Sequence, residues 1–395
     1  MHLINKIKEL ADNYFNDIVE IRRHIHQNPE LSFKEFKTSE YIASQLKKEN
    51  IYFKKGFVKT GIVAEIKGKN STKKTIALRA DMDALPIIEE NNISYKSQNN
   101  AMHACGHDAH TASLIGVAKI LNTIKTEFEG TVKLIFQPGE ELLPGGAIQM
   151  IEQGALNNPK PDIVIAQHVF PDLQAGTVGF KKGKYMASSD EIYLTIKGKG
   201  GHAAMPKITT NIVLVASKII VALHQMIENE TPETAPTVLA FGKAIANGAT
   251  NVIPNEVKFE GTFRTMDEEW RQKAHIEIKN IANSIAKKHG AQCEINIVKG
   301  YPLLNNDVET TEKAICFAQQ YLGKKHVVEL DQRMTSEDFA YYSQNFPSTF
   351  YRLGIGNKEK NIASKQHTST FNIDEDALKT GMGLMSWLAI SLLNE

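Results

Sequence analysis

The sequence predicts an α/β protein in which a helix-covered mixed sheet is interrupted by a small inserted domain. Strand-like apolar runs alternate with amphipathic helical segments through residues 1–187 and again through 299–395, which is typical of a sheet covered by helices. Residues 188–298 instead follow the order strand, helix, strand, strand, helix, strand, which is the ferredoxin-like pattern. A chain of 395 residues is also longer than a single hydrophobic core usually supports, so two domains are expected.

The segments before the insertion follow a regular alternation. Helices are expected at 3–27, 36–48, 110–125 and 146–154, and strands at 61–66, 75–80, 130–136 and 162–168. The first helix ends near Asn28-Pro29, because a proline disfavours helical geometry in the residue before it.

The insertion is expected to hold strands at 191–197, 237–244, 256–265 and 292–298, and helices at 209–227 and 267–288. The second helix has an acidic first turn from Asp267 to Glu269 and is followed by Gly290, which suits both of its ends. A helix at 308–322, a strand at 349–354 and a helix at 374–393 then return to the first pattern.

Charge and composition exclude several classes of partner. The formal net charge of +1 attracts neither nucleic acid nor an anionic membrane. Residues 1–25 are amphipathic without a continuous apolar stretch, so no secretion signal is predicted, and no apolar run approaches a membrane span. Three cysteines make no disulfide framework. We therefore expect a cytoplasmic protein, with Cys293 and Cys316 as ordinary packing residues.

Residues of the types that bind metals follow three of the predicted strands. Each of them alone would more often cap, pack or face solvent, but ligands bind beyond the carboxyl ends of strands in such sheets. A thiolate, imidazoles and carboxylates together suit zinc or a similar first-row divalent ion. The candidates are Cys105 and His107 before a helix, Glu140 and Glu141 after the strand ending at 136, His168, and His367 far along the chain.

The neighbouring glutamates Glu140 and Glu141 predict a division of labour. One carboxylate can hold a metal while the other takes a proton from the attacking water. A purely structural metal site needs ligands and no spare base, so the pair favours an enzyme over a metal-binding scaffold or sensor.

Six ordered motifs carry a resemblance that runs over nearly the whole chain. They are Arg22-Arg23-His24-Ile25-His26 with Pro29-Glu30-Leu31, then 78–86, 102–111, 136–141, Gly200-Gly201-His202-Ala203-Ala204-Met205-Pro206, and Ser336-Glu337-Asp338-Phe339. With them the sequence resembles the N-acyl-amino-acid amidohydrolases, such as hippurate hydrolase, N-acetyl-diaminopimelate deacetylase and the plant indoleacetyl-amino-acid hydrolases. That family lies within the aminoacylase and carboxypeptidase group of di-metal enzymes.

The resemblance implies a site, a cofactor and an assembly. Up to two divalent ions (zinc, manganese, nickel or cobalt) would be bound by Cys105, His107, Glu141, His168 and His367, with Glu140 as general base. Residues 188–298 would form a lid or dimerisation domain, and its His202 would reach the partner subunit's site in a homodimer or higher oligomer. Asn251 and Arg264 match positions near a substrate carboxylate, and Asp83 matches a position that orients a ligand.

The implied reaction is hydrolysis of the amide bond of small N-acyl amino acids. The alternative is a dipeptidase or carboxypeptidase that uses the same metal site on a substrate with a free amine. The sequence departs from the family pattern in two places. Gly139 stands where many members have alanine, which we expect to be harmless, and Gln366 and Thr368-Ser369 replace the usual Leu and Asn-Pro around His367.

Overall fold

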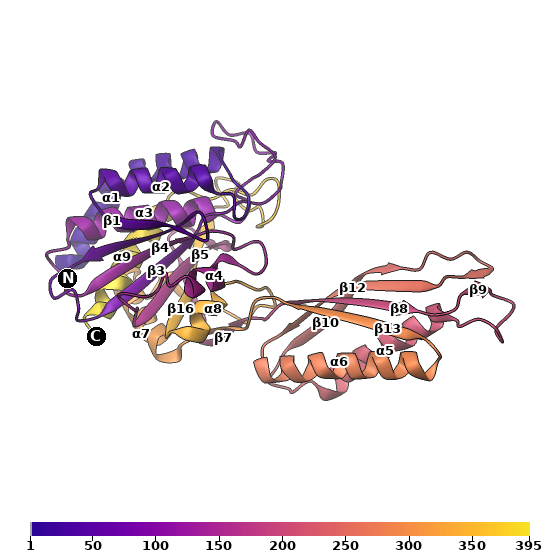
Figure 1. Ribbon diagram of the computed structural model, residues 1–395. Coiled ribbons are helices and arrows are strands. Elements are labelled where there is room, and N and C mark those ends of the chain that lie inside the picture. Colours follow the sequence, from indigo (N-terminus) through magenta and orange to yellow (C-terminus); the bar gives the residue numbers. More distant parts are fainter. Residues whose placement is uncertain (1) are drawn as a thin grey trace. The chain divides into compact units, whose positions relative to one another are not determined.

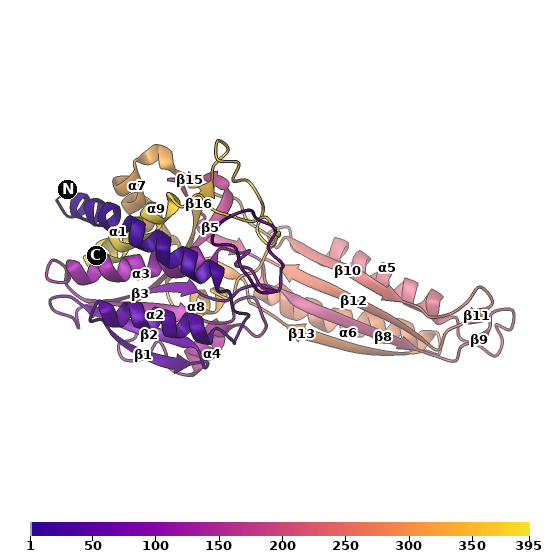
Figure 2. The same cartoon turned by 90° about the horizontal axis from the view of Figure 1, so that it is seen from above.

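The computed structural model describes residues 2–395, which form two compact units (Figures 1 and 2). The larger unit comprises the chain up to Gly183, Asn305–Asp331 and Asp338–Glu395, and the smaller unit comprises Lys184–Leu304 and Gln332–Glu337. The smaller unit therefore contains residues 188–298, extends beyond them at both ends, and takes in a short later segment.

A mixed eight-stranded sheet forms the centre of the larger unit, as the sequence predicts. Its strand order is β1-β2-β4-β3-β5-β16-β6-β15, in which β4, β3, β5 and β16 run parallel and β2 is antiparallel to both β1 and β4. The strands are β1 (Tyr52–Phe57), β2 (Gly61–Lys67), β3 (Thr75–Asp81), β4 (Thr131–Gln137), β5 (Ile163–Gln174), β6 (Val178–Phe180), β15 (Val327–Glu329) and β16 (Ser348–Gly356). Two short strands, β7 (Gly183–Met186) and β14 (Leu304–Asn306), lie where the chain passes from one unit's residue range to the other's.

Helices cover this sheet, with α1, α2 and α3 above the strands in Figure 1 and α4 and α8 below them. α3 and α9 are buried on almost all sides and contact each other, α1 and β3, so they form the centre of the core. The helices are α1 (His2–Gln27), α2 (Phe36–Lys48), α3 (His107–Thr123), α4 (Gly146–Glu152), α7 (Val308–Leu322), the 3-10 turn η1 (Lys324–His326), α8 (Ala340–Asn345) and α9 (Ala377–Leu393).

Two differences from the predicted elements matter for the site. α3 begins at His107 and not at residue 110, so His107 and His110 both lie in its first turn. β5 continues to Gln174, so His168 lies within a strand and not at its end. In the register of β3 with β5, Arg79 lies opposite Ala166, so His168 is level with Asp81 at the carboxyl end of β3.

The smaller unit is built on a four-stranded antiparallel sheet in the order β10-β12-β8-β13. Helices α5 and α6 pack together, and their apolar faces share one hydrophobic core with the sheet. The elements are β8 (Asp190–Lys197), β9 (Gly201–His202), α5 (Ile212–Glu230), β10 (Thr237–Ile245), β11 (Val252–Ile253), β12 (Glu256–Thr265), α6 (Glu268–Lys288) and β13 (Gln292–Lys299). The main elements follow the order strand, helix, strand, strand, helix, strand.

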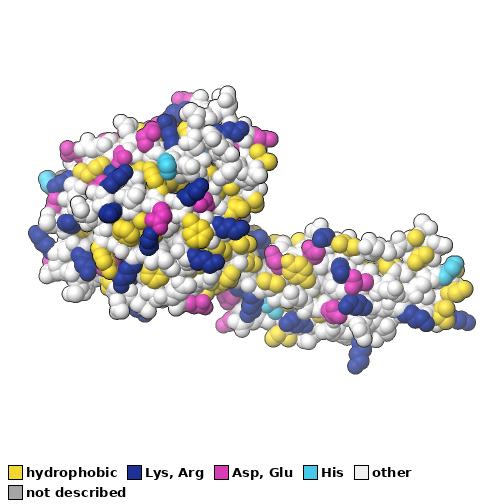
Figure 3. Space-filling view, turned by 45° about the horizontal axis from the view of Figure 1, so that its top comes forward, with side chains coloured by type: hydrophobic (Ala, Val, Ile, Leu, Met, Phe, Trp, Pro, Cys, Tyr) yellow, Lys and Arg dark blue, Asp and Glu magenta, His cyan; other side chains and the backbone are white. Residues whose placement is uncertain are grey.

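α5 corrects one expectation from the sequence. By length and composition α5 could cross a membrane. An 18-residue stretch of it has a mean hydropathy of 1.4, and 33% of that stretch is buried. A core helix passes the same test, and here α5 packs its buried side chains, Ile219 and Leu223 among them, onto the sheet of the smaller unit. Basic and acidic side chains are interspersed over the face drawn in Figure 3, in keeping with the small net charge.

Candidate metal centre

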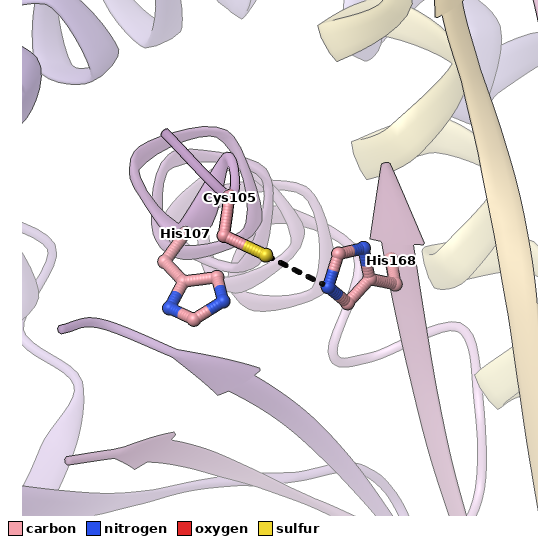
Figure 4. A group of neighbouring side chains, drawn as sticks. All are labelled: Cys105, His107 and His168. Carbon is pink, nitrogen blue, oxygen red and sulfur yellow. Dashed lines mark hydrogen bonds between the residues drawn. The ribbon is translucent and has the colours of Figure 1, made fainter. Parts of the chain in front are cut away.

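Three segments of the larger unit bring soft and nitrogen ligands together beyond the end of β3. Cys105 lies in the loop before α3, His107 is the first residue of that helix, and His168 projects from β5 (Figure 4). The Cys105 sulfur lies 3.6 Å from Nε2 of His168, and all three ligand atoms fall within 4.8 Å of one another. Cys105 and His168 are buried, and His107 is fully buried.

Hydrogen bonds fix which nitrogen of each imidazole faces the cluster. Nδ1 of His107 lies 2.9 Å from the main-chain carbonyl of Asp83 and 3.2 Å from its carboxylate, so this nitrogen carries the proton. Nδ1 of His168 donates in the same way to the Val169 carbonyl at 2.9 Å. In the neutral form of each ring Nε2 is then left with a lone pair, and among the described residues Nε2 of His107 is buried without a hydrogen-bond partner. Such an atom suits a metal ligand.

A second group of ligand atoms overlaps the first. Cys105, Glu141 and His367 also lie within 4.8 Å of one another, and Nε2 of His367 is 3.3 Å from Oε1 of Glu141. The main-chain N–H of His367 donates to the carbonyl of Ala104 at 2.8 Å, and His367 adopts a left-handed φ of 62°. Cys105 belongs to both groups, so the five residues of the two groups could together hold up to two divalent ions.

The charges of the cluster favour a cation. Burial alone would lower the pKa of His107, but the nearby Asp81, Asp83 and Glu141 raise it to about 10. Burial and the charges of Glu141 and Glu140 raise the pKa of the Cys105 thiol well above its ordinary value. Carboxylate charges contribute to both shifts, and a bound divalent ion would neutralise those charges. The residues present thus fit a metal.

Glu140 lies at the edge of this cluster. Its Oε2 is 4.0 Å from Nε2 of His107, and its Oε1 accepts the main-chain N–H of Asp338 at 3.4 Å. Glu141 points its Oε1 to within 3.9 Å of the same His107 nitrogen. The adjacent carboxylates therefore approach one histidine, and Glu141 also pairs with His367.

One further histidine of the cluster is excluded as a ligand by its hydrogen bonds. Asp81, His107 and His110 lie close enough to hold an ion. However, Nδ1 of His110 is 2.6 Å from the Asp81 carboxylate, and its Nε2 accepts the main-chain N–H of Val169 at 2.8 Å. Both nitrogens are occupied, so His110 instead joins α3 to the end of β3 and to Val169 within β5.

The remaining predicted residues lie in the smaller unit, which does not bring them together. His202 of β9 pairs with Val252 of β11, and the Ala203 N–H donates to the Asn251 carbonyl, so His202 and Asn251 are exposed neighbours. Arg264 lies near the other end of β12 and donates to the Met334 carbonyl at 3.1 Å. Glu256 and Arg264 lie roughly 25 Å apart along β12, at the usual rise per residue of a β-strand. Arg264 is therefore at the end of β12 that is far from His202 and Asn251. His202 also caps no helix, because Asn211 caps α5.

A buried network of hydrogen bonds and ion pairs around Arg79 lies next to the site. The sequence analysis gave these residues no role. The Arg79 guanidinium donates to Gln137 at 2.9 Å and to Asp338 at 2.8 Å, and it also pairs with Asp81. Asp338 accepts in turn from the Gln137 amide and from the N–H of Ala147. The motifs 78–86 and 336–339 thus hold the ends of β3 and β4 and the segment around Glu140. Because both segments are motifs of the resembled family, the sequence already marked them as candidates for a role at the site.

Gly139, which stands where many family members have alanine, suits its position in this structure. It has a φ of +64°, and a Cβ would lie 2.4 Å from the Phe33 ring, so this backbone requires glycine. Its N–H donates at 2.9 Å to Glu35, a fully buried carboxylate that also accepts from Phe33 and Thr60. Burial and the charge of Asp83 raise the pKa of Glu35 to about 7. Sequence reasoning missed Glu35 because no ligand pattern marks it.

Comparison with known proteins agrees with this geometry. The model of peptidase family M20/M25/M40 matches residues 77–390. The N-acetylcysteine deacetylase of Bacillus subtilis is 38% identical over 97% of this chain and 99% of its own. The thermostable carboxypeptidase 2 of Saccharolobus solfataricus is 36% identical over the whole of both chains. The solved Bacillus subtilis YXEP protein, a dinuclear metal binding peptidase, is 35% identical with a TM-score of 0.84, over 97% of this chain and 99% of that one.

These matches define the protein as a metal-dependent hydrolase, with ligand groups suited to a dinuclear centre. The chain belongs to peptidase family M20/M25/M40.

Proposed function

We propose that the protein hydrolyses the amide bond of small N-acyl amino acids, releasing a carboxylic acid and a free amino acid. The observation that carries the proposal is the cluster of Cys105, His107, His168, Glu141 and His367 with Glu140 beside it. Related proteins named as an N-acetylcysteine deacetylase and an N-acyl-L-amino acid amidohydrolase, each 38% identical, support this substrate class.

Each residue has a distinct task in this proposal. A divalent metal, when bound by the five ligands, acidifies water and polarises the amide carbonyl. Glu140 takes the proton of the attacking water and delivers it to the leaving nitrogen. Asp83 holds the His107 ring with Nε2 facing the ligand cluster, and Asp338 holds Glu140 through its main-chain N–H.

The alternative is a dipeptidase or carboxypeptidase reaction on a substrate with a free amine. The relative named as a thermostable carboxypeptidase keeps this alternative open. The test is a panel of acetyl-, benzoyl- and indoleacetyl-amino acids beside dipeptides of the same amino acids, each with zinc, manganese, cobalt and nickel. The proposal predicts turnover of the N-acyl compounds. Turnover of the dipeptides alone would favour the alternative.

The smaller unit is proposed to act as a ferredoxin-like lid and dimerisation domain in a cytoplasmic homodimer or higher oligomer. Its strand order β10-β12-β8-β13 supports the first part. The unpaired edge of β10 and the exposed α5 side chains Val213, Leu214 and Val221 support the second, because such surfaces often pair between subunits.

The spacing within the smaller unit supports sharing of residues between two copies. One substrate of amino-acid size is too short to touch both His202 and Arg264 of the same copy across roughly 25 Å of strand. Two copies can supply them if Arg264 serves its own subunit while His202 and Asn251 serve the partner's site. His202 would then donate a hydrogen bond to the oxyanion, a contribution of about 3 kcal/mol at most such sites.

Subunit complementation tests this sharing. His202→Ala subunits are mixed with Glu140→Ala subunits, each inactive alone, and exchange is verified by a tag on one variant. Hybrid dimers should regain activity, because one site combines an intact larger unit with an intact smaller unit from the other copy. Verified exchange without recovered activity would overturn the shared role of His202.

A further inference from the structure

Gln366 departs from the residue type usual in the resembled family and contacts two of the candidate metal ligands. Its side-chain Nε2 lies 3.7 Å from the Cys105 sulfur, 3.3 Å from Nδ1 of His168 and 3.4 Å from the Val169 carbonyl. It immediately precedes His367, so one dipeptide places an amide and an imidazole against the cluster. Leucine at this position could offer no polar contact.

The two hydrogens of this amide can be assigned from the surrounding acceptors. Nδ1 of His168 already donates to the Val169 carbonyl, so it does not accept a second proton. The Gln366 hydrogens are therefore directed to the Val169 oxygen and to the Cys105 sulfur. Both acceptors face Nε2, which fixes the orientation of the amide.

We propose that Gln366 is a positioning residue that donates a hydrogen bond to the Cys105 sulfur and so tunes its bond to the metal. The inference rests on the proposed function, because it takes Cys105 to be a metal ligand. The same amide ties the loop that carries Cys105 to Val169, the residue after His168 in β5.

The physical effect follows from the sulfur lone pairs. A hydrogen bond to a coordinated thiolate withdraws electron density from sulfur, and hydrogen bonding around a cysteine ligand is a known means of tuning a metal site. The thiolate-to-metal charge-transfer energy is therefore higher with the hydrogen bond than without it. Removing the donor should shift that absorption band to longer wavelength.

The experiment compares cobalt-loaded full-length proteins by absorption spectroscopy. Gln366→Leu removes the donor and restores the usual family residue, and Gln366→Met is a second, unbranched variant in case the first folds poorly. Thr368→Val is the matched control, because the Thr368 hydroxyl donates to the Lys365 carbonyl in the same loop and not to the Cys105 sulfur. Cobalt content and thermal unfolding are measured for every variant.

The inference predicts a charge-transfer band at longer wavelength in both Gln366 variants and an unchanged band in Thr368→Val. An unchanged band in a folded, cobalt-loaded Gln366 variant would overturn it. An equal shift in Thr368→Val would also overturn it, because the cause would then be the loop in general. If the unmodified protein bound cobalt without any thiolate band, Cys105 would not be a ligand and the proposed metal centre itself would fail.

Discussion

The larger and smaller units present their candidate residues in opposite ways. In the larger unit Cys105, His107 and His168 are buried, and each imidazole has one nitrogen tied to a fixed acceptor. In the smaller unit His202 is exposed, and its Nδ1 accepts only the nearby N–H of Ala204. A metal cluster needs preset geometry before its ligand arrives, whereas an exposed histidine at a strand end acquires its role only when another surface meets it.

The supporting contacts differ in the same direction. Buried carboxylates hold the segment 139–141 in the larger unit, with Glu35 on the N–H of Gly139 and Asp83 on the N–H of Glu141 at 3.0 Å. In the smaller unit Asp190 forms a buried cluster with Arg271 and His275, but this cluster joins β8 to α6 and touches none of the candidate site residues. In the larger unit, buried hydrogen bonds therefore hold the candidate metal ligands in place. In the smaller unit, the buried cluster stabilises only the packing of β8 against α6.

The largest expected effect separates the cysteines of the two units. Cys105→Ala should lose bound metal and lower kcat/KM by at least about a hundredfold, because it removes a sulfur common to both ligand groups. Cys293→Ala, in β13 of the smaller unit, should leave both quantities near their original values. Metal analysis and kinetics check the pair. Full metal content in Cys105→Ala would break the contrast between the units.

A smaller effect is expected from alanine at Gly139. The left-handed φ and the Phe33 ring should together destabilise the fold by about 2 kcal/mol and displace Glu140. Gly242 in β10 is the matched control, since no atom lies within 4 Å of the position its Cβ would take. Denaturant unfolding of Gly139→Ala and Gly242→Ala measures the difference. If the two variants were equally stable, the Phe33 ring would be able to move aside and the backbone to accept alanine at little cost in free energy.

Much of the fold could be predicted because periodicity reports burial directly. The bounds of α2, α7 and β12 agree with the predicted segments. β1 was missed because its Lys54, Lys55 and Gly56 give an exposed edge strand no apolar alternation. The predicted end of β5 was wrong because apolar patterning fades where the strand leaves the core after Phe170.

The candidate site was predictable only where its residue types are distinctive. Cysteine, histidine and paired glutamates stand out in a sequence, and the structure brings Cys105, His107, Glu141, His168 and His367 together. Glu35 and Gln366 act through contacts between segments far apart in the chain, and neither has a local pattern. Tertiary contacts of this kind require the fold.

The smallest predicted effect concerns the pH dependence of stability. Glu35 keeps its proton up to about pH 7 in the folded state but would lose it near its ordinary pKa of 4.5 when unfolded. The folded state therefore binds more protons between these values, and stability falls as pH rises through that window. Glu35→Gln removes the titration. Its amide oxygen can still accept from Phe33 and Gly139, while its NH2 donates to the Thr60 hydroxyl, so its stability should decline less over this range.

Urea unfolding at about pH 5 and about pH 8 measures this difference. Glu9→Gln, at an exposed position of α1, is the control and should follow the unmodified protein. Parallel curves for Glu35→Gln and the unmodified protein would mean that Glu35 does not titrate in this window. The hydrogen bond from Gly139 to Glu35 would then not depend on pH in this window.

The central claim is that Glu140 moves the proton while Glu141 holds metal. Glu140→Gln should keep the metal content of the unmodified protein and lower kcat by at least about a hundredfold, the usual size of a general acid–base contribution. Glu141→Gln, its neighbour, should instead lose metal. The measurement is kcat on an N-acetyl amino acid together with metal content for both variants. Near-normal turnover by metal-loaded Glu140→Gln would contradict the account.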